Sequence, residues 1–164
     1  MITTQISDHC LPGDYFDELR KYIVWNRSFP FYFCDTCNDN QTDDNHWYAF
    51  HLGYINNTPN GELYNKLLPF LNSLPDFRSL IRIKANFYPQ TPEIIEHAPH
   101  QDATFEHKGA IISLNTCDGF TRLEDGTKVD SIANRVLFFE PSKLHNSSTT
   151  TNAKGRFNIN INYL

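Results

Sequence analysis

The sequence lacks the features that mark membrane-spanning and duplex-binding chains. No apolar run approaches the roughly 20 residues that cross a bilayer, so we expect a soluble protein without membrane contacts. The net charge is −5 and arises within residues 1–80, whereas residues 81–164 balance. Because duplex binding needs a basic face, we expect no extended nucleic-acid interface. The N-terminus lacks the basic and apolar stretches of a secretory signal, so we expect a cytoplasmic protein.

The sequence also gives little support for a redox or metal-binding role of its cysteines. Cys34 and Cys37 have the spacing found in redox and zinc sites, but no second Cys pair or nearby His pair completes a tetrahedral zinc set. The acidic, loop-like segment around them does not place the pair at the start of a helix after a strand, where a thioredoxin-type motif belongs. We favour chance spacing, with a redox or metal role as the alternative.

The composition is that of one folded domain. The 164 residues are 40% hydrophobic and 14% aromatic, which is enough to form a core of their own. Helical spacing of apolar residues predicts a helix over residues 14–25, capped by Asp14, and a second over residues 61–74 that Pro69 kinks. Between them, residues 29–60 indicate two short strands flanking a polar loop.

From residue 79 onward the apolar period changes to two. The alternation is clearest in residues 81–88 and 156–163, whose opposite faces carry Arg, Lys, Asn and Tyr. Asp125-Gly126 is a hairpin signal. Further candidate strands lie at 109–115, 119–123, 128–132, 135–140 and 144–149. The pattern predicts a mainly β fold, an antiparallel sandwich or barrel with helices on one side. The polar faces of the end strands either meet solvent or line a cavity between two sheets.

One group of residues in this half indicates metal chemistry. His100 and Asp102 are two apart in an extended segment, so both project from the same side. His145 follows a hydrophobic strand and a short turn, which carries a second imidazole back towards the sheet. Two His and one carboxylate form the facial set typical of non-haem Fe(II) oxygenases, which leaves three coordination positions open. Arg156, on the polar face of the last strand, suits paired hydrogen bonds to a carboxylate.

With these residues in view, the C-terminal half resembles the Fe(II)/2-oxoglutarate-dependent dioxygenases and is most similar to their prolyl 4-hydroxylase-like branch. The resemblance covers roughly residues 80–163. The matching segments, in chain order, are Asn86-Phe87-Tyr88, His100-Gln101-Asp102, Asp118-Gly119-Phe120-Thr121, Leu137-Phe138-Phe139, His145 and Gly155-Arg156. Their order and spacing together carry the likeness.

The resemblance implies a double-stranded β-helix (a cupin-like jelly roll) with flanking helices and with iron between its sheets. The implied ligands of Fe(II) are His100, Asp102 and His145. The implied contacts of the co-substrate 2-oxoglutarate are Arg156, Tyr88, Asn86 and Asn158. Within a single domain of residues 1–164, we expect residues 1–78 to supply helical support and substrate loops, and residues 79–164 the jelly-roll core.

By this resemblance, the chain is expected to use Fe(II), 2-oxoglutarate and O₂ to hydroxylate a protein or peptide side chain, with proline as the leading target. Alternatives are the same chemistry on a free amino acid, a small metabolite or a nucleobase, and a jelly-roll binding module without catalysis. Arg122 is a candidate substrate contact or a solvated strand residue, and the loop at 34–46 a candidate substrate lid. A three-His zinc set of His97, His100 and His107 is the competing metal site.

Overall fold

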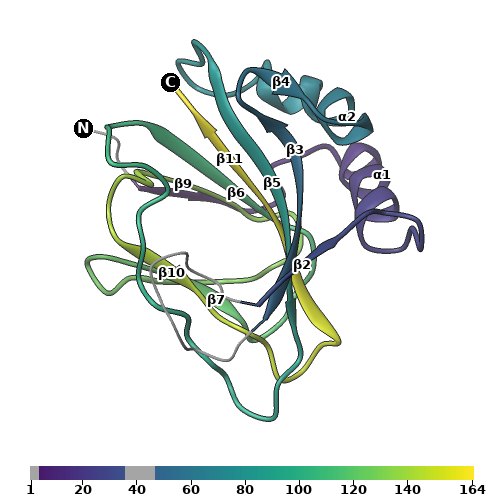
Figure 1. The fold of residues 1–164 in the computed structure, drawn as a ribbon, viewed down its shortest axis with the longest axis vertical. Helices are drawn as coiled ribbons and strands as arrows, with labels where there is room; N and C mark the ends of the chain where they lie inside the picture. The colour runs from purple at the N-terminus through teal and green to yellow at the C-terminus, as the bar shows by residue number, and fades with distance from the viewer. Residues whose placement is uncertain (1–3, 36–46) are drawn as a thin grey trace.

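The computed structural model describes residues 4–35 and 47–164, so Cys37 and most of the candidate lid lie outside the described residues. Two helices and eleven strands are described (Figure 1). The helices are α1 (Gly13–Ile23) and α2 (Glu62–Leu71). The strands are β1 (Gln5–Ser7), β2 (Tyr32–Cys34), β3 (Tyr48–Ile55), β4 (Thr58–Pro59), β5 (Leu80–Pro89), β6 (Lys108–Ser113), β7 (Phe120–Leu123), β8 (Lys128–Asp130), β9 (Val136–Phe139), β10 (His145–Ser147) and β11 (Gly155–Tyr163).

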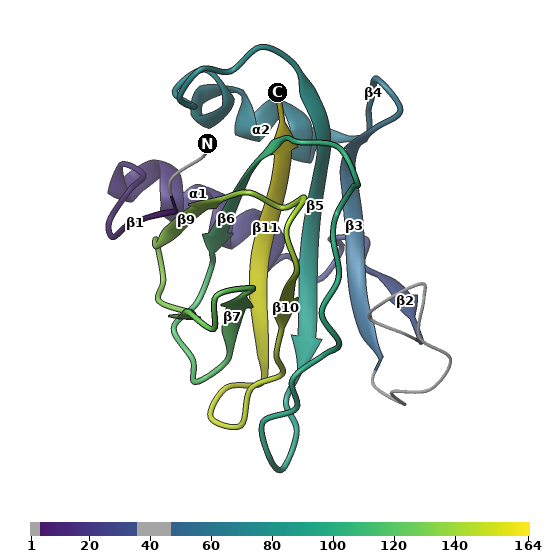
Figure 2. The same cartoon turned by 90° about the vertical axis from the view of Figure 1, so that its left-hand side faces the viewer.

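The strands form two antiparallel sheets. In the large sheet the order is β1-β9-β6-β11-β5-β3-β2, with β4 paired to β3, and in the small sheet it is β10-β7-β8. Both helices lie on one face of the large sheet and the small sheet lies on the other (Figures 1 and 2). This arrangement confirms the predicted jelly roll with flanking helices. The N-terminal part of the chain contributes strands as well as helices to it, including β1, which the sequence pattern does not predict.

Two apolar clusters hold these layers together. The larger one lies between the helices and the large sheet, where Leu19 of α1 and Leu67 of α2 pack with Ile83 and Ile161, all at most 1% exposed. The smaller one lies between the two sheets and joins Ile111, Leu137 and Phe139 of the large sheet to Val129 of the small one. Burial of this apolar area is the main force that fixes the helices against the sheet.

The helix boundaries follow the sequence prediction, but the capping of α1 does not. Helix α1 begins at Gly13, its N-cap is Pro12, and no side chain caps it by a hydrogen bond. Asp14 instead lies in the first turn, where its negative charge interacts favourably with the helix dipole. Pro69 lies in the last turn of α2, where it has no N–H to donate to the Asn65 carbonyl, and the kink there stays a prediction.

The alternating strands β5 and β11 resolve the choice between solvent and cavity. They pair along their whole length, and their apolar faces cover the helices. Their polar faces point towards the small sheet, and those of β11 are buried: Arg156, Asn158, Asn160 and Asn162 are between 1% and 8% exposed. The polar side chains therefore line the space between the sheets. No helix within the described residues has the length and apolar character to cross a membrane.

The segment that follows β5 determines where the functional residues meet. Residues 90–100 run back along the small sheet, with isolated bridges from Gln90 to Thr150, from Glu96 to Ser148 and from His100 to His145. The last bridge consists of two backbone hydrogen bonds of 2.9 Å, one in each direction between His100 and His145. Two residues far apart in sequence are thus fixed side by side by the backbone.

Candidate metal and carboxylate site

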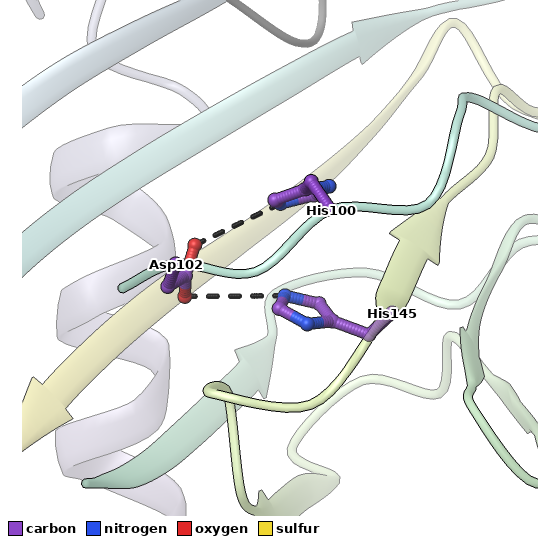
Figure 3. A group of neighbouring side chains, drawn as sticks. All are labelled: His100, Asp102 and His145. Atoms are coloured by element: carbon purple, nitrogen blue, oxygen red, sulfur yellow. Dashed lines mark ion pairs between the residues drawn. The ribbon is translucent and has the colours of Figure 1, made fainter. Parts of the chain in front are cut away.

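His100, Asp102 and His145 form one cluster between the sheets. Their potential ligand atoms all lie within 4.8 Å of one another, and they are the only such group of three among the residues described. Figure 3 shows both imidazole rings directed at the carboxylate: His100 Nε2 lies 3.7 Å from Asp102 Oδ1, and His145 Nε2 lies 3.9 Å from Oδ2. A backbone hydrogen bond from Asp102 N–H to the carbonyl of Pro141 holds Asp102 against the turn that precedes His145.

The carboxylate of Asp102 is buried yet ionised. Its side chain is 4% exposed. Burial by itself raises the pKa of Asp102, but the His100 ring, the charge of Arg82 and the Asn160 amide outweigh burial and hold the pKa well below its usual range. The group is therefore an anion at neutral pH, as a metal ligand must be.

His145 offers a neutral ring with its lone pair on the right atom. Its Nδ1 lies 3.0 Å from the Lys143 carbonyl, so Nδ1–H donates there and Nε2 keeps its lone pair facing Asp102. Burial lowers the pKa of His145 to about 4, against an opposing effect of Asp102. A cation can therefore bind to Nε2 at neutral pH without first displacing a proton.

Arg156 is a buried cation that lacks an anion. It is 1% exposed, donates to Thr121 Oγ1 at 2.8 Å and to the Ser148 carbonyl at 3.4 Å, and lies 5.5 Å from the centre of the Tyr88 ring. Its Nε has no hydrogen-bond partner, and no acidic side chain within residues 4–35 and 47–164 pairs with it. Burial disfavours the charged guanidinium and therefore lowers the pKa of Arg156. A buried guanidinium of this kind is stabilised by a carboxylate ligand.

One cavity lies beside two of the three clustered residues and beside two neighbours of Arg156. Its lining includes His100 and His145 on one side and Asn86, Tyr88, Thr121 and Asn158 on the other. Asn86 donates to Asn158 Oδ1 at 2.9 Å, and the buried Oδ1 of Asn86 has no hydrogen-bond partner. The cavity volume is about 30 Å³, about the space of two water molecules.

The remaining candidates lie around this centre. Arg122 is half-exposed and forms a two-pronged ion pair with Glu96, at 2.8 and 2.7 Å, so its contact with substrate stays a prediction. The ring of His97 pairs with Ser147, and that of His107 with the Phe105 carbonyl, 2.8 Å in each case. The three-His zinc set therefore does not form a cluster in the described structure.

The residues that hold Asp102 are not predicted by the sequence pattern. Arg82 Nη2 lies 2.7 Å from Asp102 Oδ1, and the Asn160 and Asn162 amides donate to Oδ2 at 3.0 and 3.1 Å. The period-two pattern placed all three on polar strand faces. It could not show that a loop residue twenty positions after Arg82 would lie against those faces.

Comparison with known proteins bears on the fold. No protein-family model and no curated protein matches the sequence. Solved structures do match: a Pseudomonas putida prolyl-4-hydroxylase is 12% identical, covers 99% of this chain and 93% of its own, and has a TM-score of 0.65. The chain has the fold of the Fe(II)/2-oxoglutarate oxygenases. The resemblance inferred from the sequence is confirmed at this level.

Two further solved structures, a hydroxylase and an epimerase, share this fold. A prolyl hydroxylase from Trichoplax adhaerens, solved with a hypoxia inducible factor peptide, is 16% identical, with coverage of 98% and 83% and a TM-score of 0.70. The epimerase SnoN from nogalamycin biosynthesis, described as non-heme and alpha ketoglutarate dependent, is 12% identical, with coverage of 99% and 78% and a TM-score of 0.67. One fold thus serves both a peptide and a small-molecule substrate.

The residues present fit the metal and co-substrate of these enzymes. The two imidazoles and one carboxylate are a donor set suited to Fe(II) with open positions. The unpartnered Nε of Arg156 and Oδ1 of Asn86 are a donor and an acceptor that an anionic, hydrated ligand would satisfy. His100, Asp102 and His145 would hold the metal, and Arg156 with Thr121 would hold a carboxylate.

Gly119 makes room for Arg156 and allows a direct test of this end of the site. A Cβ at Gly119 would lie 2.6 Å from the Thr149 carbonyl oxygen and 2.8 Å from Arg156 Cδ. Gly119→Ala is therefore expected to displace Arg156 and raise the KM for 2-oxoglutarate about 10-fold, a loss of about 1.4 kcal/mol. Steady-state kinetics would measure it. Gly13→Ala, where a Cβ meets nothing within 4 Å, is the control, and equal KM values for the two variants would contradict the prediction.

Proposed function

We propose that the chain is an Fe(II)- and 2-oxoglutarate-dependent dioxygenase. The observation that carries the proposal is the His100-Asp102-His145 cluster together with the buried Arg156, whose neighbours Thr121 and Tyr88 line the same cavity as His100 and His145. When bound, Fe(II) and 2-oxoglutarate supply O₂ activation coupled to oxidative decarboxylation. His100, Asp102 and His145 would hold the metal, and a set of only three protein ligands would leave coordination positions for the co-substrate and O₂.

The other described residues have two roles: some bind the co-substrate, and others line the space between it and the metal ligands. Arg156, with the Thr121 hydroxyl beside it, binds the far carboxylate of the co-substrate by charge-assisted hydrogen bonds. Tyr88 and the Asn86–Asn158 pair line the space between that carboxylate and the metal ligands. Their burial excludes bulk water, which protects a reactive oxidant from unproductive reduction.

We further propose a protein or peptide side chain as the substrate, with proline as the leading candidate. Support comes from the similarity of the fold to two prolyl hydroxylases, one of them solved with a peptide. The alternative substrate is a free amino acid, small metabolite or nucleobase. Similarity of the fold to SnoN, solved in one case with nogalamycin RO, supports this small-molecule alternative. The proposed arrangement keeps residues 1–164 as one domain, with substrate selection by the loops of residues 1–78.

The reaction class is tested first, without a substrate. Anaerobic addition of Fe(II) and 2-oxoglutarate to the protein is expected to produce a visible metal-to-ligand absorption band, and exposure to O₂ to yield succinate. Absence of both would instead support a binding module without catalysis.

A substrate panel then separates the two substrate classes. Prolyl peptides, other peptides, free amino acids and nucleobases are compared by stimulated succinate formation and by a 16 Da mass gain of the acceptor. Stimulation by free small molecules alone would reject the peptide assignment.

A further inference from the structure

The inner faces of β5 and β11 meet the metal-ligand carboxylate at one point. Arg82 and Asn162 are directly opposite each other in the pairing of the two strands, and Asn160 is the next residue on the same face of β11. All three side chains point into the space between the sheets and contact Asp102. Asp102 belongs to the segment after β5, so the large sheet holds a residue that the loop supplies.

The contacts are divided unequally between the two carboxylate oxygens. Oδ2 accepts from both Asn160 and Asn162, at 3.0 and 3.1 Å, which occupies the two lone pairs of a carboxylate oxygen. Oδ1 forms an ion pair with Arg82 Nη2 at 2.7 Å and lies 3.7 Å from His100 Nε2, while His145 Nε2 lies 3.9 Å from Oδ2. The two amide hydrogen bonds both go to Oδ2, so Oδ1 is the oxygen with lone-pair capacity for a cation.

We propose that Arg82, Asn160 and Asn162 are positioning residues that orient Asp102 so that it binds the metal through Oδ1 alone. This inference rests on the proposed function, because it assigns roles around the same metal site. Arg82 also compensates the charge of a carboxylate that is 4% exposed, which keeps Asp102 in place before the metal binds. Asn160 and Asn162 prevent the carboxylate from rotating into a position in which it would bind the metal through both oxygens.

The contacts with Asp102 leave other polar atoms of the same three side chains unsatisfied. Within the part of the chain that the structure describes, the Nε of Arg82 and the Oδ1 atoms of Asn160 and Asn162 are buried without hydrogen-bond partners. Side chains that only stabilised the fold would leave fewer buried polar atoms without a partner, since each such atom costs free energy. Their one shared partner is the carboxylate, so their arrangement serves that residue.

The test uses the full chain with Co²⁺ as the probe, without 2-oxoglutarate or substrate. Arg82→Gln is expected to weaken Co²⁺ binding by about 10- to 100-fold in titration calorimetry, the range found when outer-shell partners of metal ligands are removed. It is also expected to change the visible spectrum of bound Co²⁺, because the carboxylate is free to reorient. Arg82→Lys, which keeps the charge, should recover part of the affinity.

A matched control distinguishes this role from general loss of an ion pair. Arg135, just before β9, forms a more exposed ion pair of similar length, 2.6 Å, with Asp8, just after β1. Arg135→Gln is expected to leave Co²⁺ affinity and spectrum unchanged. If Arg82→Gln also left both unchanged, the positioning role would be overturned while the metal site stood. If the wild-type protein bound no Co²⁺, the proposed function would fall and this inference with it.

Thermal melting of the metal-free protein gives a second, independent readout. Arg82→Gln leaves Asp102 without its cation and is expected to lower the melting temperature by about 5 °C. In the background of Asp102→Asn, where there is no charge to compensate, the same substitution should cost little. An equal loss in both backgrounds would show that Arg82 acts by packing alone and would overturn the proposal.

Discussion

Asp102→Ala is expected to abolish 2-oxoglutarate turnover. Asp102 is the only carboxylate among the three proposed ligands, and its removal leaves two imidazoles with Arg82 unpaired beside them. Metal affinity should fall by more than the roughly 10- to 100-fold that follows loss of an outer-shell partner. Succinate formation and Fe(II) affinity measure the two effects.

Because Asp102→Ala also removes the partner of Arg82, Asp102→Asn serves as a companion variant that keeps the shape of the side chain. It should fold and still fail in turnover, since an amide supplies no negative charge to the metal. Asp130→Ala, an exposed carboxylate of β8, is the matched control and should retain full activity. Turnover by Asp102→Asn at the wild-type rate would refute the metal role.

Arg156→Met is expected to raise the KM for 2-oxoglutarate about 100-fold or more. Two charge-assisted hydrogen bonds to a carboxylate are lost, each worth about 1.5–3 kcal/mol, and a Met offers no donor in their place. Steady-state kinetics give the KM. The thermal shift caused by 2-oxoglutarate gives the affinity separately, because a ligand that binds only the folded state raises its stability.

The same substitution makes an unusual prediction for the ligand-free protein. Arg156 is a buried cation without an anionic partner in the described structure, so replacing it by an apolar side chain removes a desolvation cost. We expect the melting temperature of Arg156→Met to lie within about 4 °C of the wild type, equal to about 1 kcal/mol. A large loss of stability together with unchanged KM would assign Arg156 to the core.

Much of this site could be predicted from the sequence because its signals are local. The two-residue spacing of His100 and Asp102 places both on one side of an extended segment whatever surrounds it. Period-two alternation in residues 81–88 and 156–163 likewise places every Arg, Lys and Asn of those strands on one face. The fold confirms both. Strand β1 was not predicted, because three residues are too few for a periodic signal.

What the sequence by itself determined is therefore which residues share a face and which chemistry they can support. Only the tertiary structure decided what those faces meet. A bridge between His100 and His145 brings the second imidazole to the carboxylate, and burial between two sheets turns Arg156 into a cation that requires a ligand. Arg82 meets Asp102 for the same reason: contacts between a strand and a returning loop depend on how the layers pack, which local periodicity does not encode.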